Sequence, residues 1–376
     1  MDKCRICGKD FYPDPLLELL NMPAAAQNFP VWETLDQDRG IAMNVRQCSG
    51  CGVVQIDSEP VPYYREVIRA SAYSPEMKSF RLKQFADWVK KYDLQNKKVL
   101  EAGCGKGEYL DLMSQSGPRC FGTEYSSESV QICKEKGLNV QKVFFEKGCE
   151  DLSEAPFDAF FILNWLEHIP DLSIFLKILS NQLIPEAPGL IEVPNYDMIK
   201  QNGLLTEFTA EHLYYFTEST LEGTLAAHGF DVQEYRSVWD HYILSAEVRK
   251  RRQDDPNRFS DQKKKINSQV RGFLSRYPKT VVWGAGHQSL MVLAMLGLTE
   301  NEIRYVIDSA PVKQGKFTFV SHLPIVDPSY LESDPPDAVM IMCAGYSDEV
   351  VRMIRKKQGN RFALAIMREN GLEEQC

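Results

Sequence analysis

The sequence lacks any apolar run long enough to cross a membrane. A transmembrane helix needs about 20 consecutive apolar residues, and the longest runs here, such as 290–298, are far shorter. The N-terminal residues MDKCRIC also lack the apolar core of a secretory signal peptide. We therefore expect a cytoplasmic protein without a membrane partner.

An excess of positive charge is also missing. Lysine and arginine total 43 against 52 aspartate and glutamate residues, so the formal net charge is −9. General nucleic-acid binding requires a basic face, so we expect no nucleic-acid partner. A local basic pocket for a small acidic molecule is still compatible with this charge.

Composition predicts a folded protein of several domains. With 376 residues, of which 44% are hydrophobic and 25% charged, two or three domains are expected. A module with paired cysteines occupies 1–70, and alternating strand and helix patterns over 71–248 predict a doubly wound α/β sheet. The charged segment 249–275 predicts a solvated helical connector. A second alternating series over 276–376 predicts a smaller Rossmann-like domain.

Four of the ten cysteines form two Cys-x-x-Cys pairs, each followed by glycine. Disulfides are not expected in a reducing compartment, whereas two such pairs supply four thiolates to one tetrahedral zinc ion. Four protein ligands leave no open coordination position, so a structural zinc is favoured over a catalytic one, and a module without metal is the alternative. The expected ligands are Cys4, Cys7, Cys48 and Cys51.

A glycine-rich turn, EAGCGKG at 101–107, follows a predicted strand and opens a predicted helix. Its glycines allow the backbone to approach a ligand closely, and Glu124 ends the next strand, where a carboxylate can accept hydrogen bonds from two ribose hydroxyls. Glu101 would repel a pyrophosphate and attract a sulfonium or an amino group. The turn therefore favours S-adenosylmethionine over a dinucleotide, and the alternative is a doubly wound domain without a cofactor.

The segments EAGCGKGEYL, FGTEYS and ILNWLEHIPD resemble the motifs of class I S-adenosylmethionine-dependent methyltransferases. This resemblance implies that the glycines lie near the methionine moiety and that Glu124 binds the ribose. It also implies that Asn164 and Trp165 face the cofactor from the end of the fourth strand. The implied cofactor-binding residues are Glu101, Gly103, Cys104, Gly105, Gly107, Glu124, Asn164 and Trp165.

The order of all the motifs resembles the three-domain sugar C-methyltransferases. CRICG…PAAAQNF…CSGCGVVQ precedes the central unit, and VVWGAGHQ…VIDSAPVKQGKFTFVSHLPI follows it. The resemblance implies an N-terminal zinc module, a class I methyltransferase domain and a C-terminal Rossmann-like domain. It also implies that the last domain helps hold a nucleotide-activated keto-deoxysugar, with Gly284 and Gly286 in its turn. Alternatively, that glycine turn serves only close strand–helix packing.

Methylation at carbon requires a base, because the C–H next to a ketone must lose its proton to form an enolate. The resemblance points to Glu211 and His212 in TAEHLYYFT, and an unperturbed histidine pKa near 6.5 suits His212 as the base. Glu211 would orient His212, hold a sugar hydroxyl or do neither. The other catalytic candidates are Tyr214 and His168, and the substrate-binding candidates are Tyr73, Tyr215, Gly284 and Gly286.

The chain departs from the family pattern in two places. The family commonly has Tyr-x-Glu-His where this chain has Thr209-Ala210-Glu211-His212, and the serine-containing segment 71–79 has no histidine after it. An O- or N-methyltransferase acting on a related acceptor is therefore an alternative, and so is a non-catalytic zinc and Rossmann assembly module. The sequence leaves open the nucleotide, the sugar, the methylated atom and the oligomeric state.

Overall fold

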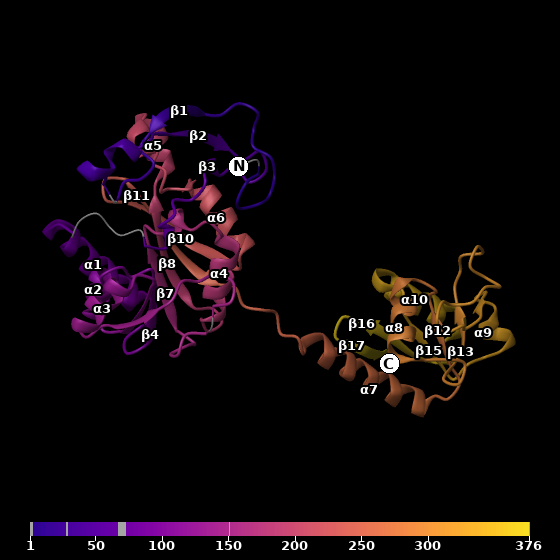
Figure 1. The fold of residues 1–376 in the computed structure, drawn as a ribbon. Coiled ribbons are helices and arrows are strands. Elements are labelled where there is room, and N and C mark those ends of the chain that lie inside the picture. The colour runs from indigo at the N-terminus through magenta and orange to yellow at the C-terminus, as the bar shows by residue number, and fades with distance from the viewer. Residues whose placement is uncertain (1–2, 28, 67–72, 150, 376) are drawn as a thin grey trace. The chain divides into compact units, whose positions relative to one another are not determined.

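The computed structural model describes the chain in two compact units, Met1–Arg252 and Gln253–Cys376, which we treat separately (Figure 1). The described residues are 3–27, 29–66, 73–149 and 151–375. No helix among them is long and apolar enough to cross a bilayer.

A four-stranded antiparallel sheet near the N-terminus has the strand order β1-β2-β3-β9. Its strands are β1 (Leu17–Met22), β2 (Ile41–Gln47), β3 (Val54–Ile56) and β9 (Tyr214–Tyr215). β9 comes from the segment predicted as the central domain, and Val54 pairs with Tyr215. The N-terminal module is thus completed by the next predicted domain. The predicted boundary itself, between residues 70 and 71, lies outside the described residues.

The central sheet of the first unit has seven strands in the order β10-β11-β8-β7-β4-β5-β6. All strands are parallel except β11, which is antiparallel to both of its neighbours. The strands are β4 (Lys98–Ala102), β5 (Arg119–Glu124), β6 (Asn139–Lys142), β7 (Ala159–Leu163), β8 (Pro188–Pro194), β10 (Phe230–Val238) and β11 (Ile243–Lys250). The chain leaves β4 toward β5 and returns on its other side at β7, and ligands bind at such a switch point.

Helices cover both faces of this sheet, because alternate strand residues point to opposite faces. Phe161 and Leu163 pack with α1 (Pro75–Lys91), α2 (Glu108–Ser114) and α3 (Ser127–Glu135). Phe160 and Ile162 pack with α4 (Leu172–Asn181) and α6 (Glu218–Ala227), whereas α5 (Tyr196–Asn202) packs with the N-terminal sheet. These layers confirm the predicted doubly wound α/β class.

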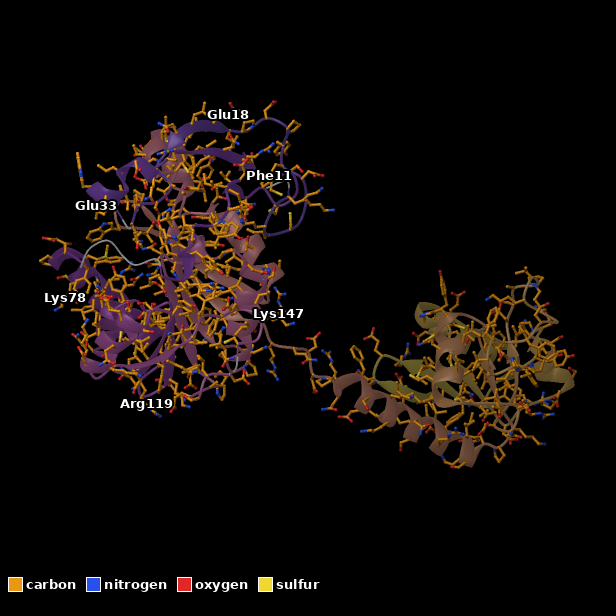
Figure 2. The ribbon with its side chains drawn as sticks, viewed as in Figure 1. Phe11, Glu18, Glu33, Lys78, Arg119 and Lys147 are labelled. Atoms are coloured by element: carbon orange, nitrogen blue, oxygen red, sulfur yellow. The ribbon has the colours of Figure 1, made fainter. Side chains whose placement is uncertain are left out.

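The first long helix, α1, buries Arg81, Phe85, Trp88 and Val89. Ser74 caps the helix by accepting a hydrogen bond from the Met77 backbone. Lys78 lies on the exposed side of the helix (Figure 2). A charged arginine therefore occupies the stripe that faces the sheet.

The second unit is a six-stranded sheet in the order β14-β13-β12-β15-β16-β17. Its strands are β12 (Thr280–Trp283), β13 (Ile303–Ile307), β14 (Ile325–Val326), β15 (Ala338–Ile341), β16 (Ala363–Arg368) and β17 (Gly371–Gln375). Only β17 is antiparallel to its neighbour. Its helices are α7 (Arg258–Arg276), α8 (His287–Leu296), α9 (Tyr330–Ser333) and α10 (Ser347–Gln358).

The segment predicted as a solvated connector differs from that expectation in its second half. Helix α7 buries Val270 and Phe273 in the core of the second unit. The Gln269 side chain also accepts a hydrogen bond from the backbone of Leu372, at 3.1 Å. The apolar residues of this segment are few, but they fall on one helical face, and this is sufficient to dock the helix.

Candidate functional site

The glycine turn joins β4 to α2 at the carboxyl edge of the central sheet. Gly103, Gly105 and Gly107 have φ angles of +75°, +56° and +80°. A Cβ on Gly103 would lie 2.4 Å from the Trp165 indole, and one on Gly107 would lie 2.4 Å from the Leu138 side chain. Glycine is therefore required at both positions by backbone angle and by space.

Two further predicted cofactor residues, Glu101 and Cys104, lie within this turn and are buried. Glu101 is 2% exposed and Cys104 is 3% exposed. The Cys104 backbone N–H donates to Thr123 O at 2.9 Å, and its side chain packs in the core beneath α2. A hydrogen bond with Cys133, together with burial, raises the pKa of the Cys104 thiol. The Cys104 side chain thus packs the turn from below.

Glu124 ends β5 and holds the glycine turn through its carboxylate. One oxygen accepts from the Gly105 backbone at 3.0 Å and the other from the Ser126 backbone at 2.7 Å. Burial raises the pKa of Glu124, although these two hydrogen bonds act in the opposite direction. An ionised carboxylate has about four lone-pair positions, so each oxygen can still accept a hydrogen bond from a ligand.

A cluster of aromatic side chains, which the sequence analysis did not predict, lies next to Glu124. The Phe144 ring lies edge-on to Trp165, Tyr125 and Tyr64, with centroid distances of 5.7, 6.3 and 5.6 Å. The Arg65 guanidinium lies over the Tyr64 and Tyr125 rings and pairs with Glu146 at 2.6 Å. Tyr125 directly follows Glu124 in the sequence, and that adjacency is the signal that could have identified it.

Asn164 follows β7 in a left-handed backbone conformation, with φ of +48°. Its backbone N–H donates to Glu192 O at 2.8 Å. Its side-chain Oδ1 is buried and has no hydrogen-bond partner among the described residues. A buried acceptor without a partner is costly, so this amide fits a site in which a ligand donates to it.

Two histidines meet near the same edge of the sheet. His168 ends a short 3-10 turn after β7, and His212 lies just before β9. Their ring centroids are 4.8 Å apart at an interplanar angle of 77°. Glu167, which the sequence analysis did not single out, lies beside them, with its Oε1 4.0 Å from His168 Nε2. The structure therefore brings together two of the four catalytic candidates and adds a buried carboxyl group.

The protonation of this cluster differs from that of free side chains. His168 Nδ1 lies 2.9 Å from the Glu211 carbonyl oxygen, which can only accept, so Nδ1 carries the hydrogen and Nε2 is unprotonated. Burial lowers the pKa of His168 to about 4. Burial and the neighbouring His168 lower the pKa of His212 to about 3, whereas burial raises the pKa of Glu167 to about 8. At neutral pH both imidazoles are therefore uncharged, and their pKa values lie well below the expected value near 6.5.

Glu211 faces the N-terminal module with its side chain. Its Oε1 accepts hydrogen bonds from the Tyr63 hydroxyl at 2.6 Å and from the Ala26 backbone at 3.2 Å. Burial and this carboxylate raise the pKa of Tyr63 to about 12. Ala26 belongs to the PAAAQNF motif. Glu211 thus joins the module to the loop of His212, and its backbone carbonyl orients His168.

The three tyrosine candidates have structural contacts. The Tyr214 hydroxyl donates to Pro170 O at 2.9 Å, and the Tyr215 hydroxyl donates to Glu207 O at 3.1 Å. Both side chains are 1% exposed, and the Tyr73 ring stacks on Tyr109 at 5.9 Å. The hydroxyls of Tyr214 and Tyr215 therefore hold the backbone on either side of β9.

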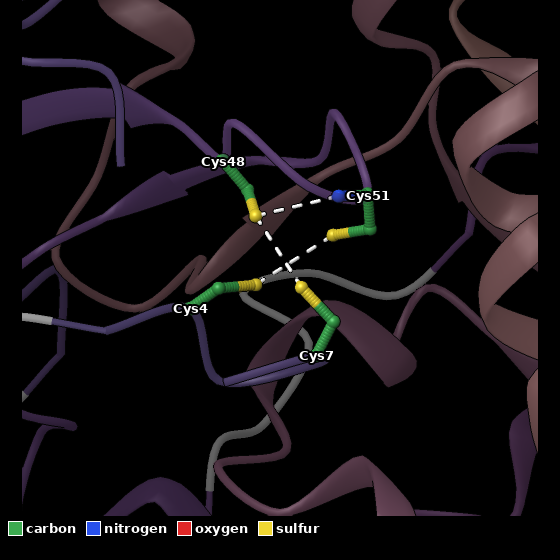
Figure 3. A group of neighbouring side chains, drawn as sticks. All are labelled: Cys4, Cys7, Cys48 and Cys51. Carbon is green, nitrogen blue, oxygen red and sulfur yellow. Dashed lines mark hydrogen bonds between the residues drawn. The ribbon is translucent and has the colours of Figure 1, made fainter. Parts of the chain in front are cut away.

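The paired cysteines lie together, as Figure 3 shows. All four are free thiols, and their sulfur atoms lie within 4.8 Å of one another. The Cys4–Cys51 and Cys7–Cys48 sulfurs are 3.6 and 3.4 Å apart. Four sulfurs bound to zinc at about 2.3 Å lie about 3.8 Å apart in a regular tetrahedron. The Gln55 amide also donates to the Cys4 sulfur at 2.9 Å, so the donor set fits a zinc ion.

The glycine turn of the second unit follows β12. A Cβ on Gly284 would lie 2.7 Å from Met342 O, whereas one on Gly286 would meet nothing within 4 Å. Close packing thus explains Gly284 alone. Asp308, which the sequence analysis did not single out, follows β13 and accepts from the Ala285 backbone at 2.8 Å. Although burial opposes it, hydrogen bonding by Lys313 lowers the pKa of Asp308.

Two protein families match the chain in succession. A methyltransferase domain matches residues 76–235, and a C-methyltransferase C-terminal domain matches residues 246–366. The C-methyltransferase NovU of Streptomyces niveus is 23% identical, and the match covers 97% of this chain and 96% of NovU. A ubiquinone biosynthesis O-methyltransferase of Idiomarina loihiensis is 29% identical over 32% of this chain and 51% of its own length.

Among solved structures, magnesium protoporphyrin IX methyltransferase from Synechocystis PCC 6803 with bound S-adenosylhomocysteine is 15% identical. That match covers 50% of this chain and 92% of the other, with a TM-score of 0.38. The two matched families follow each other along one chain, and NovU aligns with it almost from end to end. The chain therefore carries a methyltransferase domain followed by a C-methyltransferase C-terminal domain, and it is similar to a C-methyltransferase along almost its whole length.

Proposed function

We propose that this enzyme methylates a carbon atom next to the ketone of a nucleotide-activated keto-deoxysugar. The observation that carries the proposal is the contact between two uncharged imidazoles, those of the buried His168 and the half-buried His212, at the edge of the sheet that holds the glycine turn. Transfer to carbon needs an unprotonated base, and the full-length similarity to a C-methyltransferase agrees with that chemistry.

S-adenosylmethionine would supply an electrophilic methyl group on its sulfonium. Glu124 would accept from the ribose hydroxyls, and Tyr125 and Phe144 would contact the adenine. Glu101 and the unpartnered Asn164 Oδ1 would accept from the ammonium group, since both are acceptors at the carboxyl edge of the sheet. Trp165, which packs on Gly103, would close the site from the side of β7.

In the proposed mechanism His212 removes the proton from the carbon next to the ketone. The electron pair of that C–H bond moves toward the carbonyl oxygen to give an enolate. Its carbon would accept the methyl group as the bond between that group and the sulfonium sulfur breaks, with S-adenosylhomocysteine as the leaving group. Holding the two reactants together supplies much of the rate acceleration. His168, whose Nε2 is unprotonated, stands next to His212 and can take up its proton. Glu211 is a positioning residue, because its contacts are to Tyr63, Ala26 and His168.

A panel of keto-deoxysugar nucleotides tests the proposal. In deuterium oxide with S-adenosylhomocysteine, the enzyme should exchange the acidic C–H of its acceptor, and with S-adenosylmethionine it should form a new C–C bond visible by NMR. Methylation at oxygen or nitrogen without exchange would support the heteroatom alternative. Absence of methyl transfer to every acceptor would support the assembly-module alternative.

In the pH profile of kcat/KM, activity should be lost on the acid side at a pH well below the pKa of a free imidazole. A base must be unprotonated, and a lowered pKa keeps the imidazole neutral to lower pH. With pKa values of about 3 and 4 for His212 and His168, kcat/KM for the acceptor should be flat from pH 7 to about pH 5. Stopped assays across this range measure it, and a limb centred near pH 6.5 would contradict the buried base.

Glu124→Ala should weaken binding of S-adenosylhomocysteine. Two ribose hydroxyls would lose a charged acceptor, which costs about 1.5–3 kcal/mol. Calorimetry gives the affinity directly, and Glu128→Ala, an exposed substitution on the neighbouring helix α3, is the matched control. Equal affinities for the wild type and Glu124→Ala would remove Glu124 from the cofactor site.

We also propose that the four paired cysteines hold a structural zinc ion. The support is the arrangement of their sulfurs and the hydrogen bonds that these receive from Gln55 and from the backbone of Ile6 and Gly50. The ion would join the N-terminal loop to the β2–β3 turn. Because β3 pairs with β9, it would also support the strand that follows His212.

The second unit is proposed to bind the nucleotide part of the acceptor. Gly286 opens helix α8 without a side-chain cap, and helix N-termini favour anionic groups. Asp308 stands at the end of the neighbouring strand, which is the position that Glu124 has in the first unit. Small residues in the turn and a carboxylate beside it suit a phosphate and a ribose.

A further inference from the structure

A carboxyl group beside the two histidines has no role in the mechanism described so far. Glu167 lies in the 3-10 turn Leu166–His168 that follows β7, and it is 1% exposed. Its backbone carbonyl accepts from the Leu213 N–H at 2.8 Å, so the turn is tied to the residue after His212. The side-chain Oε2 is buried and has no hydrogen-bond partner among the described residues. Buried polar groups in native proteins nearly always have a partner, so Oε2 fits a position that a ligand completes.

Within the described part of the chain, no cation stabilises an ionised carboxylate at Glu167. Its contact of the ion-pair kind is to His168, with Oε1 4.0 Å from Nε2, and that nitrogen is unprotonated. The other titratable side chains around it, His212, Tyr215 and Tyr242, are uncharged at neutral pH. A carboxylate without a partner is very costly to bury, so a carboxyl group in such surroundings keeps its proton. Glu167 is therefore a neutral carboxylic acid, and burial raises its pKa to about 8.

The ketone oxygen of the acceptor needs a hydrogen-bond donor, because negative charge develops on it when His212 removes the proton. The neighbouring polar side chains use their hydrogens elsewhere. His168 Nδ1 donates to a backbone carbonyl, and so do the hydroxyls of Tyr214 and Tyr215. Apart from the base itself, the Glu167 carboxyl is thus the described side chain of this cluster whose hydrogen is still available.

The distances allow one ketone to contact both groups. A carboxyl oxygen of Glu167 and a ring nitrogen of His212 lie within 4.8 Å of each other. In a ketone, the carbon that loses the proton and the carbonyl oxygen are about 2.4 Å apart. With contacts of about 2.6–3.2 Å on each side, the C–H can face His212 while the oxygen faces Glu167. His212 is half-buried, so the cluster is accessible from its side.

We propose that the Glu167 carboxyl donates a hydrogen bond to the ketone oxygen of the acceptor and so stabilises the enolate. The inference rests on the proposed function, because it names a further catalytic residue for the same reaction. The proton of the C–H bond goes to His212, its electron pair goes to the oxygen, and Glu167 keeps its own hydrogen throughout. When the new C–C bond forms, that pair returns to the carbon and the ketone is restored. A neutral donor suits this step, whereas an ionised Glu167 would repel the enolate.

The first test measures C–H exchange in deuterium oxide with S-adenosylhomocysteine. The probes are the keto-deoxysugar nucleotides of the panel above, thymidine diphosphate 4-keto-6-deoxyglucose among them. Glu167→Met removes the donor at nearly constant length and should slow exchange by about 10²- to 10³-fold, the usual effect of losing one such donor. Glu167→Gln keeps an N–H donor and should retain most of the rate. Glu222→Met, an exposed change on α6, is the matched control and should leave the rate unchanged.

The second test follows the same exchange as the pH is raised, after subtraction of the rate without enzyme. The wild type should lose exchange above about pH 8, because ionisation of Glu167 removes the hydrogen that it donates. Glu167→Gln has no carboxyl group to ionise there, so its exchange should stay level through this range. A residue that only packed the turn would give no such difference, and matching profiles for the two proteins would overturn the inference.

Calorimetry with S-adenosylhomocysteine shows whether each variant keeps its cofactor site, and the affinity should be nearly unchanged. Exchange at the wild-type rate in Glu167→Met would overturn the inference and leave the proposed function standing. Absence of exchange with every member of the panel in the wild type would overturn the proposed function, and the inference with it. If Glu167→Met does not fold, the pH profile of Glu167→Gln still decides between a donor and a packing residue.

Discussion

His212→Asn is expected to lower turnover by about 10²- to 10⁴-fold, the usual contribution of a general base. Asparagine keeps much of the size and one hydrogen-bonding nitrogen but cannot accept the proton of the acceptor C–H. Binding of S-adenosylhomocysteine should be nearly unchanged, because His212 lies beside His168 and Tyr215 and away from the contacts of Glu124. Steady-state rates and calorimetry on the same preparation measure the two effects.

His241→Asn is the matched control for this variant. His241 is an exposed residue of the first unit with φ of +65°, a conformation that asparagine adopts readily, so turnover should be retained. Near-normal turnover in His212→Asn would remove His212 from the mechanism. The base would then be sought at His168, whose Nε2 is unprotonated, because the Tyr214 hydroxyl and the Glu211 carboxylate are bound elsewhere.

Cys48→Ser is expected to release the zinc ion and to lower the free energy of unfolding by several kcal/mol. Structural zinc contributes about 10–16 kcal/mol of apparent folding energy in small zinc-finger peptides. The sheet it would stabilise here has three short strands besides β9. Elemental analysis should find one zinc per wild-type chain and less in the variant, whose thermal unfolding should begin at a lower temperature. Stability should change more than the methyl-transfer chemistry itself.

Cys149→Ser, a half-buried cysteine outside the cluster, is the control and should retain the metal. Protein purified without chelator and found to contain no zinc would contradict the proposal. A loosened module should also disturb Glu211, because Tyr63 and Ala26 both bind its carboxylate. The acceptor KM should therefore rise in Cys48→Ser, whereas the affinity for S-adenosylhomocysteine should change little.

Short-range patterns in the sequence correctly indicated the glycine turn, the neighbouring carboxylate and the clustering of the cysteines. In the turn, positive φ angles and close contacts admit only glycine, and Glu124 lies at the end of the very next strand. The two Cys-x-x-Cys pairs are local motifs whose geometry follows from the turn between each pair. The alternation of strand and helix likewise predicted both α/β sheets, because hydrophobic periodicity is a local signal.

Other features depended on contacts between distant segments, which only the tertiary structure decided. Strand β9 completes the N-terminal sheet, and no local pattern in two tyrosines indicates that pairing. Burial and the neighbouring His168 lower the pKa of His212 to about 3, although the residue type alone suggested a value near 6.5. In the sequence, nothing distinguishes Arg81 from the other charged residues of an amphipathic helix. The fold nevertheless buries it against Glu192. The sequence determined where the candidate residues stand along the chain, while burial determined their charge and their partners, because desolvation depends on every segment packed around a group.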